Sequence, residues 1–391
     1  MLDSFLRQVT KDSYGPISYH DGTSHPAIVH KFHDAFSVLG WGRMPDQLLG
    51  RGRLSAFLFS KWNSALLSES LWKQYLKSPD SLAFRKAGAS IQQSGNLSSR
   101  LNELAETFPI ASSFMGSIQE SQFKELDEKR PLVKEDLLDP QFFDSKPVSL
   151  PFLFPVCTLI QEEKIPHTLV MGRTVWDYSV FRSDARKQKG LRPLPFEFIC
   201  HFRLTDTSLK RLKVDSVSLP KTASLQTLQT GVEWDFPVIE LGLAQNPFDK
   251  RIGLSDALWM TGLAPEQLQT AILTAAWIAS FMRFQMKKVT LNSLKLRFAI
   301  QEDGAFVLND SFLLEDLFLE KDGHSFHTDL SLEFYQKTSW FESVLHARHH
   351  AETFGLAEWR RAVAEPAPFL DSKVKARLES DQQELLKCLS E

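Results

Sequence analysis

The chain has few cysteines, no long apolar run and almost no net charge. Its 391 residues include only three cysteines, at positions 157, 200 and 388, and none of them belongs to a CxxC pair. Disulfide frameworks and zinc ribbons need several cysteines at short, regular spacings. The sequence therefore predicts neither feature and suits a reducing compartment.

Secretion, membrane insertion and nucleic-acid binding are not predicted either. No window contains the roughly 18 unbroken apolar residues of a membrane span, and the most apolar stretch, 271–286, is interrupted by polar side chains, as in a buried helix. The first residues, MLDSFLRQVTKDS, carry acidic side chains and lack the apolar centre of a signal peptide. A net charge of −3 gives no broad positive field. We expect a cytoplasmic protein.

Hydrophobic residues make up 43% of the chain, which is enough for a large core with several lobes. From about residue 64 to 150 the composition becomes polar, and apolar residues recur at helical spacing in segments such as SSRLNELAETF. Prolines interrupt the chain at the end of this stretch, where they break helical hydrogen bonding. This pattern predicts an inserted helical subdomain.

Strand and helix patterns follow one another in the second half of the chain. HTLVMGRTVWDYSVF (167–181) and FEFICHFRL (196–204) are rich in β-branched and aromatic residues, so they are predicted to form the central sheet. A helix is predicted from Pro265 to about Lys288, because proline is tolerated in the first helical turn. A hairpin, LNSLKLRFAI and FVLNDSF around EDGA, follows, and helices begin near SLEFYQKTSW. The predicted class is α+β.

Five segments resemble the SAICAR synthetase family in the correct order, and two of them are PVIELGLAQNPFDKRIGLSDAL (237–258) and SLEFYQKTSW (331–340). DAFSVLGWGRMPDQLLGRGRLSAFLF (34–59) resembles the family segment S-A-F-D-V followed by I-P-x-K-G-x-x-L-T-x-L-S-x-F-W-F. PFEFICHFRLTDTSLKR (195–211) is similar to the signature P-[IV]-E-x-[IV]-V-R-x-Y-L-T-G-S-A-W-K. LKLRFAIQEDGAFVLNDSFLLEDLF (294–318) resembles ADTKFEFG, an acidic turn and LIDEVLTPDSSR. A resemblance by chance would have to reproduce both the order of these segments and the spacing of residues within them.

This resemblance implies a two-lobed, ATP-grasp-related α+β fold with antiparallel sheets. It also implies the family reaction, an ATP-dependent ligation of a carboxylate to an amine, with ATP and Mg²⁺ as cofactors. The expected organisation is a nucleotide-binding lobe beginning in 1–63, an inserted helical subdomain at 64–150, a central sheet at 151–215, a C-terminal lobe at 216–345 and a helical tail at 346–391.

The resemblance also implies site residues, which are carried over by position. They form three groups: Glu197 and Lys295 for nucleotide; Arg51, Arg53, Ser55, His201 and Lys210 for an anionic ligand; and Asn309, Asp310 and Glu315 for a metal ion.

Several family positions carry different residues here. The Asp and the second acid of ADTKFEFG fall on Ser293 and Arg297, and the Arg of PDSSR falls on Phe318. The Gly-Ser of the signature falls on Asp206 and Thr207, which puts a carboxylate where the family accommodates a phosphate. These replacements weaken both metal and phosphate binding.

The sequence therefore predicts a non-catalytic binding or regulatory protein with a degenerate active site, with a protein partner docking on the 64–150 insertion. The alternative is an ATP-dependent ligase or kinase-like enzyme for a phosphorylated purine-precursor-like substrate. SAICAR synthase activity itself is the less favoured outcome.

Overall fold

The computed structural model describes part of the chain. The described residues are 34, 36–38, 41, 44–66, 68–84, 87, 167–170, 173–176, 178–181, 192–206, 208–209, 229–244, 250–300, 306–308, 312–326, 329–354 and 359–390. The segment SSRLNELAETF and most of the predicted insertion lie outside them. Within these ranges, no helix is both long and apolar enough to cross a membrane.

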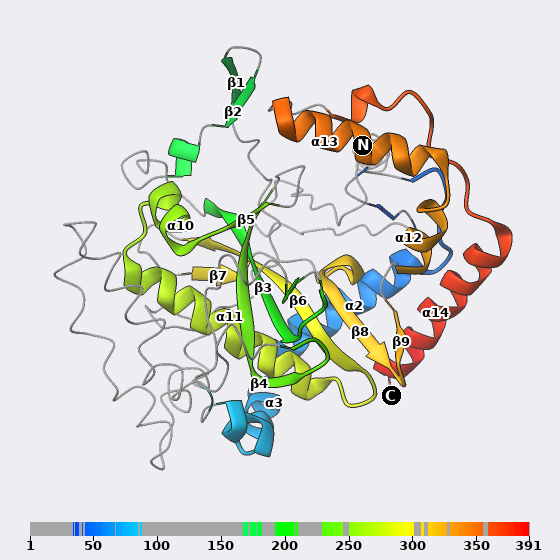
Figure 1. Cartoon of the computed structure of the whole chain (residues 1–391). Coiled ribbons are helices and arrows are strands. Elements are labelled where there is room, and N and C mark those ends of the chain that lie inside the picture. Colours follow the sequence, from blue (N-terminus) through cyan, green and yellow to red (C-terminus); the bar gives the residue numbers. More distant parts are fainter. Residues whose placement is uncertain are drawn as a thin grey trace, which may run out of the picture.

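A seven-stranded antiparallel sheet organises the described part of the chain (Figure 1). Its order is β5 (Arg251–Ile252), β4 (Glu233–Leu243), β3 (Arg192–Arg203), β6 (Thr290–Ile300), β8 (Leu317–Lys321) and β9 (His324–Ser325), and β7 (Phe306–Leu308) pairs with β6. Helices surround this sheet, which confirms the predicted α+β class and the hairpin of β6 and β7.

One face of the sheet is apolar because side chains alternate along a strand. On β3, Phe196, Phe198, Cys200 and Phe202 are buried in the main hydrophobic core. Helix α11 (Pro265–Gln285) contributes its buried residues to the same core, and Figure 1 shows it running along the sheet. The proline at its first turn confirms the predicted helix start.

Four more helices contribute to the main core. Leu58 and Trp62 of α2 (Arg51–Leu66) and Leu385 of α14 (Ser372–Ser390) are fully buried in it. Helix α3 (Glu69–Leu76) packs on α11, where Tyr75 Oη donates a hydrogen bond of 2.8 Å to Ser280 Oγ. A short helix, α10 (Leu254–Thr261), precedes α11.

A second core joins the N-terminal residues to the C-terminal helices. It contains Phe36 and Val38 together with buried residues of α12 (Asp329–Tyr335), α13 (Ser339–Phe354) and η4 (Trp359–Ala362). Leu378 of α14 belongs to this second core, whereas Leu385 belongs to the first. Helix α14 therefore connects the two cores, and it lies within the predicted tail 346–391.

One prediction about the central sheet is wrong. Strands β1 (His167–Val170) and β2 (Arg173–Trp176) pair with each other in a separate two-stranded sheet, and η1 (Tyr178–Phe181) follows them. β-propensity identified the strands, but it does not determine which strands pair. In the seven-stranded sheet, β3 lies in the range 151–215 that was predicted to form the central sheet. The other six strands lie in the range 216–345 that was predicted to form the C-terminal lobe.

Removal of buried volume from α14 should destabilise the main core. We expect Leu385→Ala to lower the free energy of unfolding by about 2–5 kcal/mol, because the cavity left behind adds to the lost burial. Leu345→Ala on α13 is the control, since Leu345 is 47% exposed. Urea unfolding of both variants measures the difference. Equal effects would show that α14 is not part of the core.

Candidate functional site

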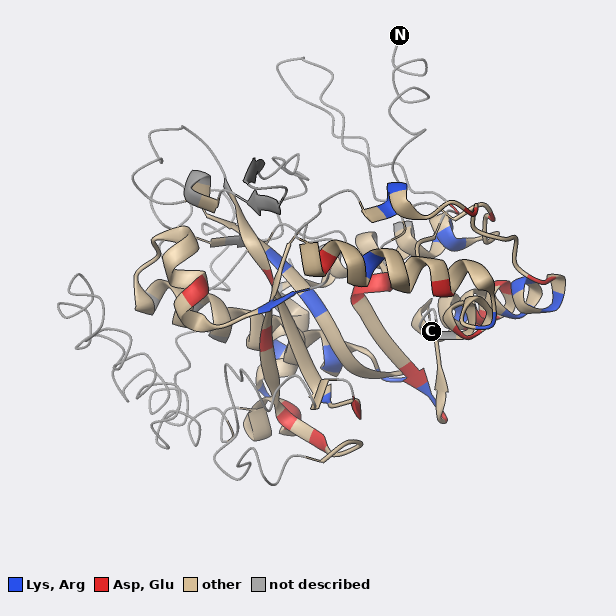
Figure 2. Ribbon diagram, turned by 45° about the horizontal axis from the view of Figure 1, so that its top comes forward, with Lys and Arg blue, Asp and Glu red and all other residues tan. Residues whose placement is uncertain are grey.

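The face of the sheet opposite the apolar core is polar and charged. Glu197, Ile199 and His201 alternate with the core-facing residues of β3. The register places Arg297 opposite Glu197 and Lys295 opposite Ile199 on β6. Figure 2 shows acidic and basic residues close together along these central strands. We call this surface the polar face.

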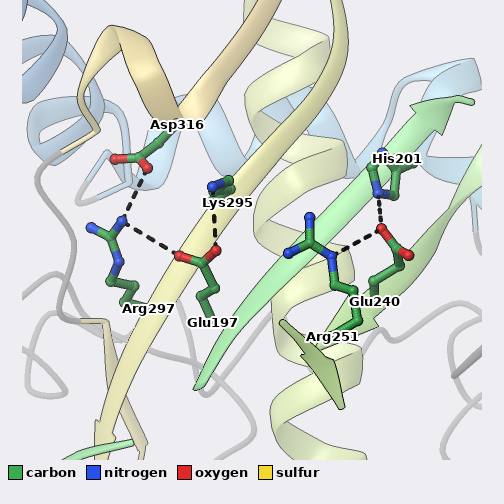
Figure 3. A network of polar contacts seen from close by, with 7 residues as sticks. All are labelled: Glu197, His201, Glu240, Arg251, Lys295, Arg297 and Asp316. Atoms are coloured by element: carbon green, nitrogen blue, oxygen red, sulfur yellow. Dashed lines mark hydrogen bonds and ion pairs between the residues drawn. The ribbon is translucent and has the colours of Figure 1, made fainter. Parts of the chain in front are cut away.

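The first group of charges surrounds Glu197 (Figure 3). Lys295 Nζ lies 3.3 Å from Glu197 Oε1, and Arg297 Nη2 lies 3.5 Å from Glu197 Oε2. The same Arg297 nitrogen lies 3.1 Å from Asp316 Oδ1. Asp316 ends η3 (Leu314–Asp316), which precedes β8. Three elements distant in sequence thus meet in one ion-pair network.

Asp316 is the most unusual member of this group. Its side chain is only 6% exposed, and Oδ2 has no hydrogen-bond partner in the described part of the chain. Burial raises the pKa of the Asp316 carboxyl, while the neighbouring Arg297 and Lys295 act in the opposite direction. One oxygen of this carboxylate is therefore paired and the other is not.

The second group surrounds Glu240 of β4. His201 Nε2 lies 2.8 Å from Glu240 Oε2, and Arg251 Nε of β5 lies 3.5 Å from the same oxygen. An ionised carboxylate only accepts hydrogen bonds, so in this contact Nε2 of His201 donates to Glu240 Oε2. Both His201 and Glu240 are buried, which makes this a strongly oriented pair.

Gly242 allows the two groups to approach one another. A Cβ atom at this position would lie 3.1 Å from Arg251 Nη1 and 3.2 Å from Glu197 Oε1. Both atoms therefore lie over the backbone of β4, where any larger residue would meet them. The polar face is continuous from Glu240 to Asp316.

The predicted residues on α2 separate into two environments. Arg51 is buried and forms an ion pair with Glu315 of η3. Ser55 is buried one turn further along, whereas Arg53 is exposed. Asp34 Oδ1 accepts a hydrogen bond of 2.8 Å from the backbone N–H of Gly52 and so anchors the start of the helix. The structure thus brings Arg51 to η3 and leaves Arg53 on the surface.

The remaining predicted residues have different outcomes. Glu197 and Lys295 contact one another, and His201 lies on the same face of the sheet. Lys210, Asn309 and Asp310 lie outside the described residues.

Of the predicted metal ligands, only Glu315 lies among the described residues. Among them, no three His, Cys, Asp or Glu side chains are grouped as metal ligands. Glu315, which the sequence assigned to a metal, is paired with Arg51. The two converging carboxylates, of Glu197 and Asp316, already share a guanidinium.

Sequence reasoning missed Glu240, Arg251, Asp316 and Gly242. One signal was present for Glu240, which is a single charge within the apolar strand sequence FPVIELGL. A buried charge needs a partner, so this position could have been marked. The identity of the partner depends on strand pairing.

A methyl group at Gly242 should disturb the polar face. We expect Gly242→Ala to lower the free energy of unfolding by about 1–3 kcal/mol, because the added Cβ overpacks Arg251 and Glu197. The same change should cost less in an Arg251→Ala background, where the closest atom is gone. Urea unfolding of the two single variants and the double variant measures this coupling. Strict additivity would contradict the close approach.

Comparison with known proteins bears on the sequence resemblance. No family model matches the chain. A putative phosphoribosylaminoimidazole-succinocarboxamide synthase of Archaeoglobus fulgidus is 23% identical over 199 residues, which are 50% of this chain and 57% of that protein. The chain thus spans little more than half the length of this curated relative.

Solved SAICAR synthetases give partial superpositions. A SAICAR synthetase (Type-2) in complex with ADP matches with a TM-score of 0.31 and 18% identity, over 46% of this chain and 67% of that chain. The enzyme of Saccharomyces cerevisiae in complex with SAICAR matches with a TM-score of 0.34 and 16% identity, over 51% and 62%. The sequence match confirms that about half of this chain is similar to SAICAR synthetases, as a divergent relative of that group.

Proposed function

We propose that the chain is a SAICAR synthetase-like binding protein whose polar face holds a small ligand and which does not carry out the ATP-dependent ligation. The observation that carries this proposal is the pairing of charges within the polar face. Lys295 and Arg297 contact Glu197, and Arg251 and His201 contact Glu240.

The charges of the polar face balance. Three basic side chains, Arg251, Lys295 and Arg297, are matched by the carboxylates of Glu197, Glu240 and Asp316 when all six are ionised. Phosphoryl transfer depends on fixed positive charge around the phosphate oxygens, supplied by metal ions and basic side chains. Here a phosphate group would compete with buried carboxylates for each cation.

Asp206, just after β3, and Phe318, on β8, also support the proposal that the chain does not carry out the ligation. Asp206, which follows β3, is exposed and adds a negative charge where the family signature has glycine. Phe318 of β8, paired with Ser293, stands where the family motif has arginine. Neither side chain can stabilise a phosphate.

An ATP-dependent ligase is the second candidate. Lys295 keeps a family lysine on β6, and its side chain is 26% exposed, so a nucleotide phosphate could reach it. The two candidates differ in whether ATP is consumed.

Ligand binding and turnover can be tested together. With Mg-ATP, the carboxyaminoimidazole ribotide and aspartate, we expect no release of ADP from ATP. With ADP as the binding probe, we expect a rise of several degrees in the unfolding midpoint, because a ligand at 100 times its Kd adds about 2.7 kcal/mol. Lys295→Met should reduce this rise relative to the variant's own midpoint without ligand.

Lys337→Met is the control, since Lys337 is exposed on another part of the molecule. Steady release of ADP that depends on all three substrates would establish the ligase instead. The absence of any shift with ADP and with the ribotide would refute ligand binding on the polar face.

We also propose that the chain has a regulatory role in which a protein partner docks on the 64–150 insertion. Its support is the sequence, which places a long polar segment between α3 and β1. Removal of residues 88–150 is expected to leave the ADP-induced shift unchanged.

A further inference from the structure

Two carboxylates from different elements converge on one nitrogen of Arg297. Its Nη2 lies 3.5 Å from Glu197 Oε2 on β3 and 3.1 Å from Asp316 Oδ1 on η3 (Figure 3). Both carboxylate side chains are more than nine-tenths buried, at 8% and 6% exposed. Two buried carboxylates this close together are stabilised by a cation between or beside them, or by protonation of one of them.

The guanidinium does not satisfy this arrangement completely. Asp316 Oδ2 is buried and has no hydrogen-bond partner within the described ranges. Glu315, the residue before Asp316, adds a further carboxylate on the same turn, where Arg51 pairs with it. A divalent cation can engage both oxygens of a carboxylate and complete its shell with water. The carboxylates of Glu197 and Asp316 thus present more oxygen atoms to a cation than Nη2 of Arg297 contacts.

We propose that Arg297 is a built-in cation that occupies the place of a divalent metal ion between Glu197 and Asp316. This inference rests on the ion pairs alone and not on the proposed function. Its consequence is that removal of the guanidinium should open a site for Mg²⁺ or Mn²⁺. The unaltered chain should not have that site.

The test is a Mn²⁺ titration of the full-length chain and its variants, with free Mn²⁺ followed by electron paramagnetic resonance. Arg297→Ser is expected to bind one Mn²⁺ per chain at least tenfold more tightly than the unaltered chain. Arg297→Lys, which keeps a cation on β6, should show no gain. Arg297→Ser combined with Glu197→Gln should lose the gain, because one of the two converging carboxylates is neutralised.

Arg203→Ser is a matched control on the same sheet. Arg203 Nη1 lies 3.3 Å from both oxygens of Glu320, and its side chain is 31% exposed, against 30% for Arg297. Its partner is one carboxylate, so its removal should not create a comparable Mn²⁺ site.

Some outcomes would overturn the inference. These are equal Mn²⁺ binding by the unaltered chain and Arg297→Ser, no gain in a folded Arg297→Ser chain, or a gain that survives Glu197→Gln. If Arg297→Ser does not fold, Arg297→Gln keeps more of the side-chain volume. Mn²⁺ should then raise the unfolding midpoint of Arg297→Gln and leave that of the unaltered chain unchanged, and the reverse would refute the proposal. No ADP is used, so this result is separate from the test of ligand binding.

Discussion

The buried carboxylate of Glu197 is the constraint on which the polar face depends. A buried charge is costly without a partner, and Glu197 has two, Lys295 and Arg297 on the neighbouring strand. The side chains of Lys295 and Arg297 must therefore lie on the same face of the sheet as the Glu197 carboxylate. A shift of β6 by one residue would turn both cations towards the apolar core. The ion pairs and the hydrophobic core therefore demand the same register.

The main hydrophobic core contains the apolar residues of β3 and β6 and so holds this register in place. The main core covers the apolar face of the sheet, and the second core binds the N-terminal residues 36–48 to α12 and α13. Helix α14 contributes to both cores. Lys321 at the end of β8 also contacts Glu384 of α14 at 2.9 Å. The strand that follows Asp316 is thus attached to α14.

The pairing of charges on the polar face is the physical basis of the proposed binding function. Cations that are already paired do not generate a strong field for phosphate, yet they remain oriented and can exchange partners with a ligand. The His201–Glu240 pair shows the same principle, because the carboxylate orients the imidazole and Arg251 offsets its charge. Charge balance favours binding of a small ligand over stabilisation of a highly charged transition state.

The sequence by itself determined the α+β class, the start of α11, the hairpin of β6 and β7, the C-terminal helices and the resemblance to SAICAR synthetases. These features depend on local signals, such as proline in a first turn and alternation along a strand, or on the order of short motifs. Only the tertiary structure decided which charges meet. Arg51 and Glu315 are 264 positions apart, and Arg297 reaches Glu197 across 100 positions. It also separated β1 and β2 from the main sheet. Strand pairing and helix packing select such partners, and neither can be read from local propensity, which acts over only a few residues.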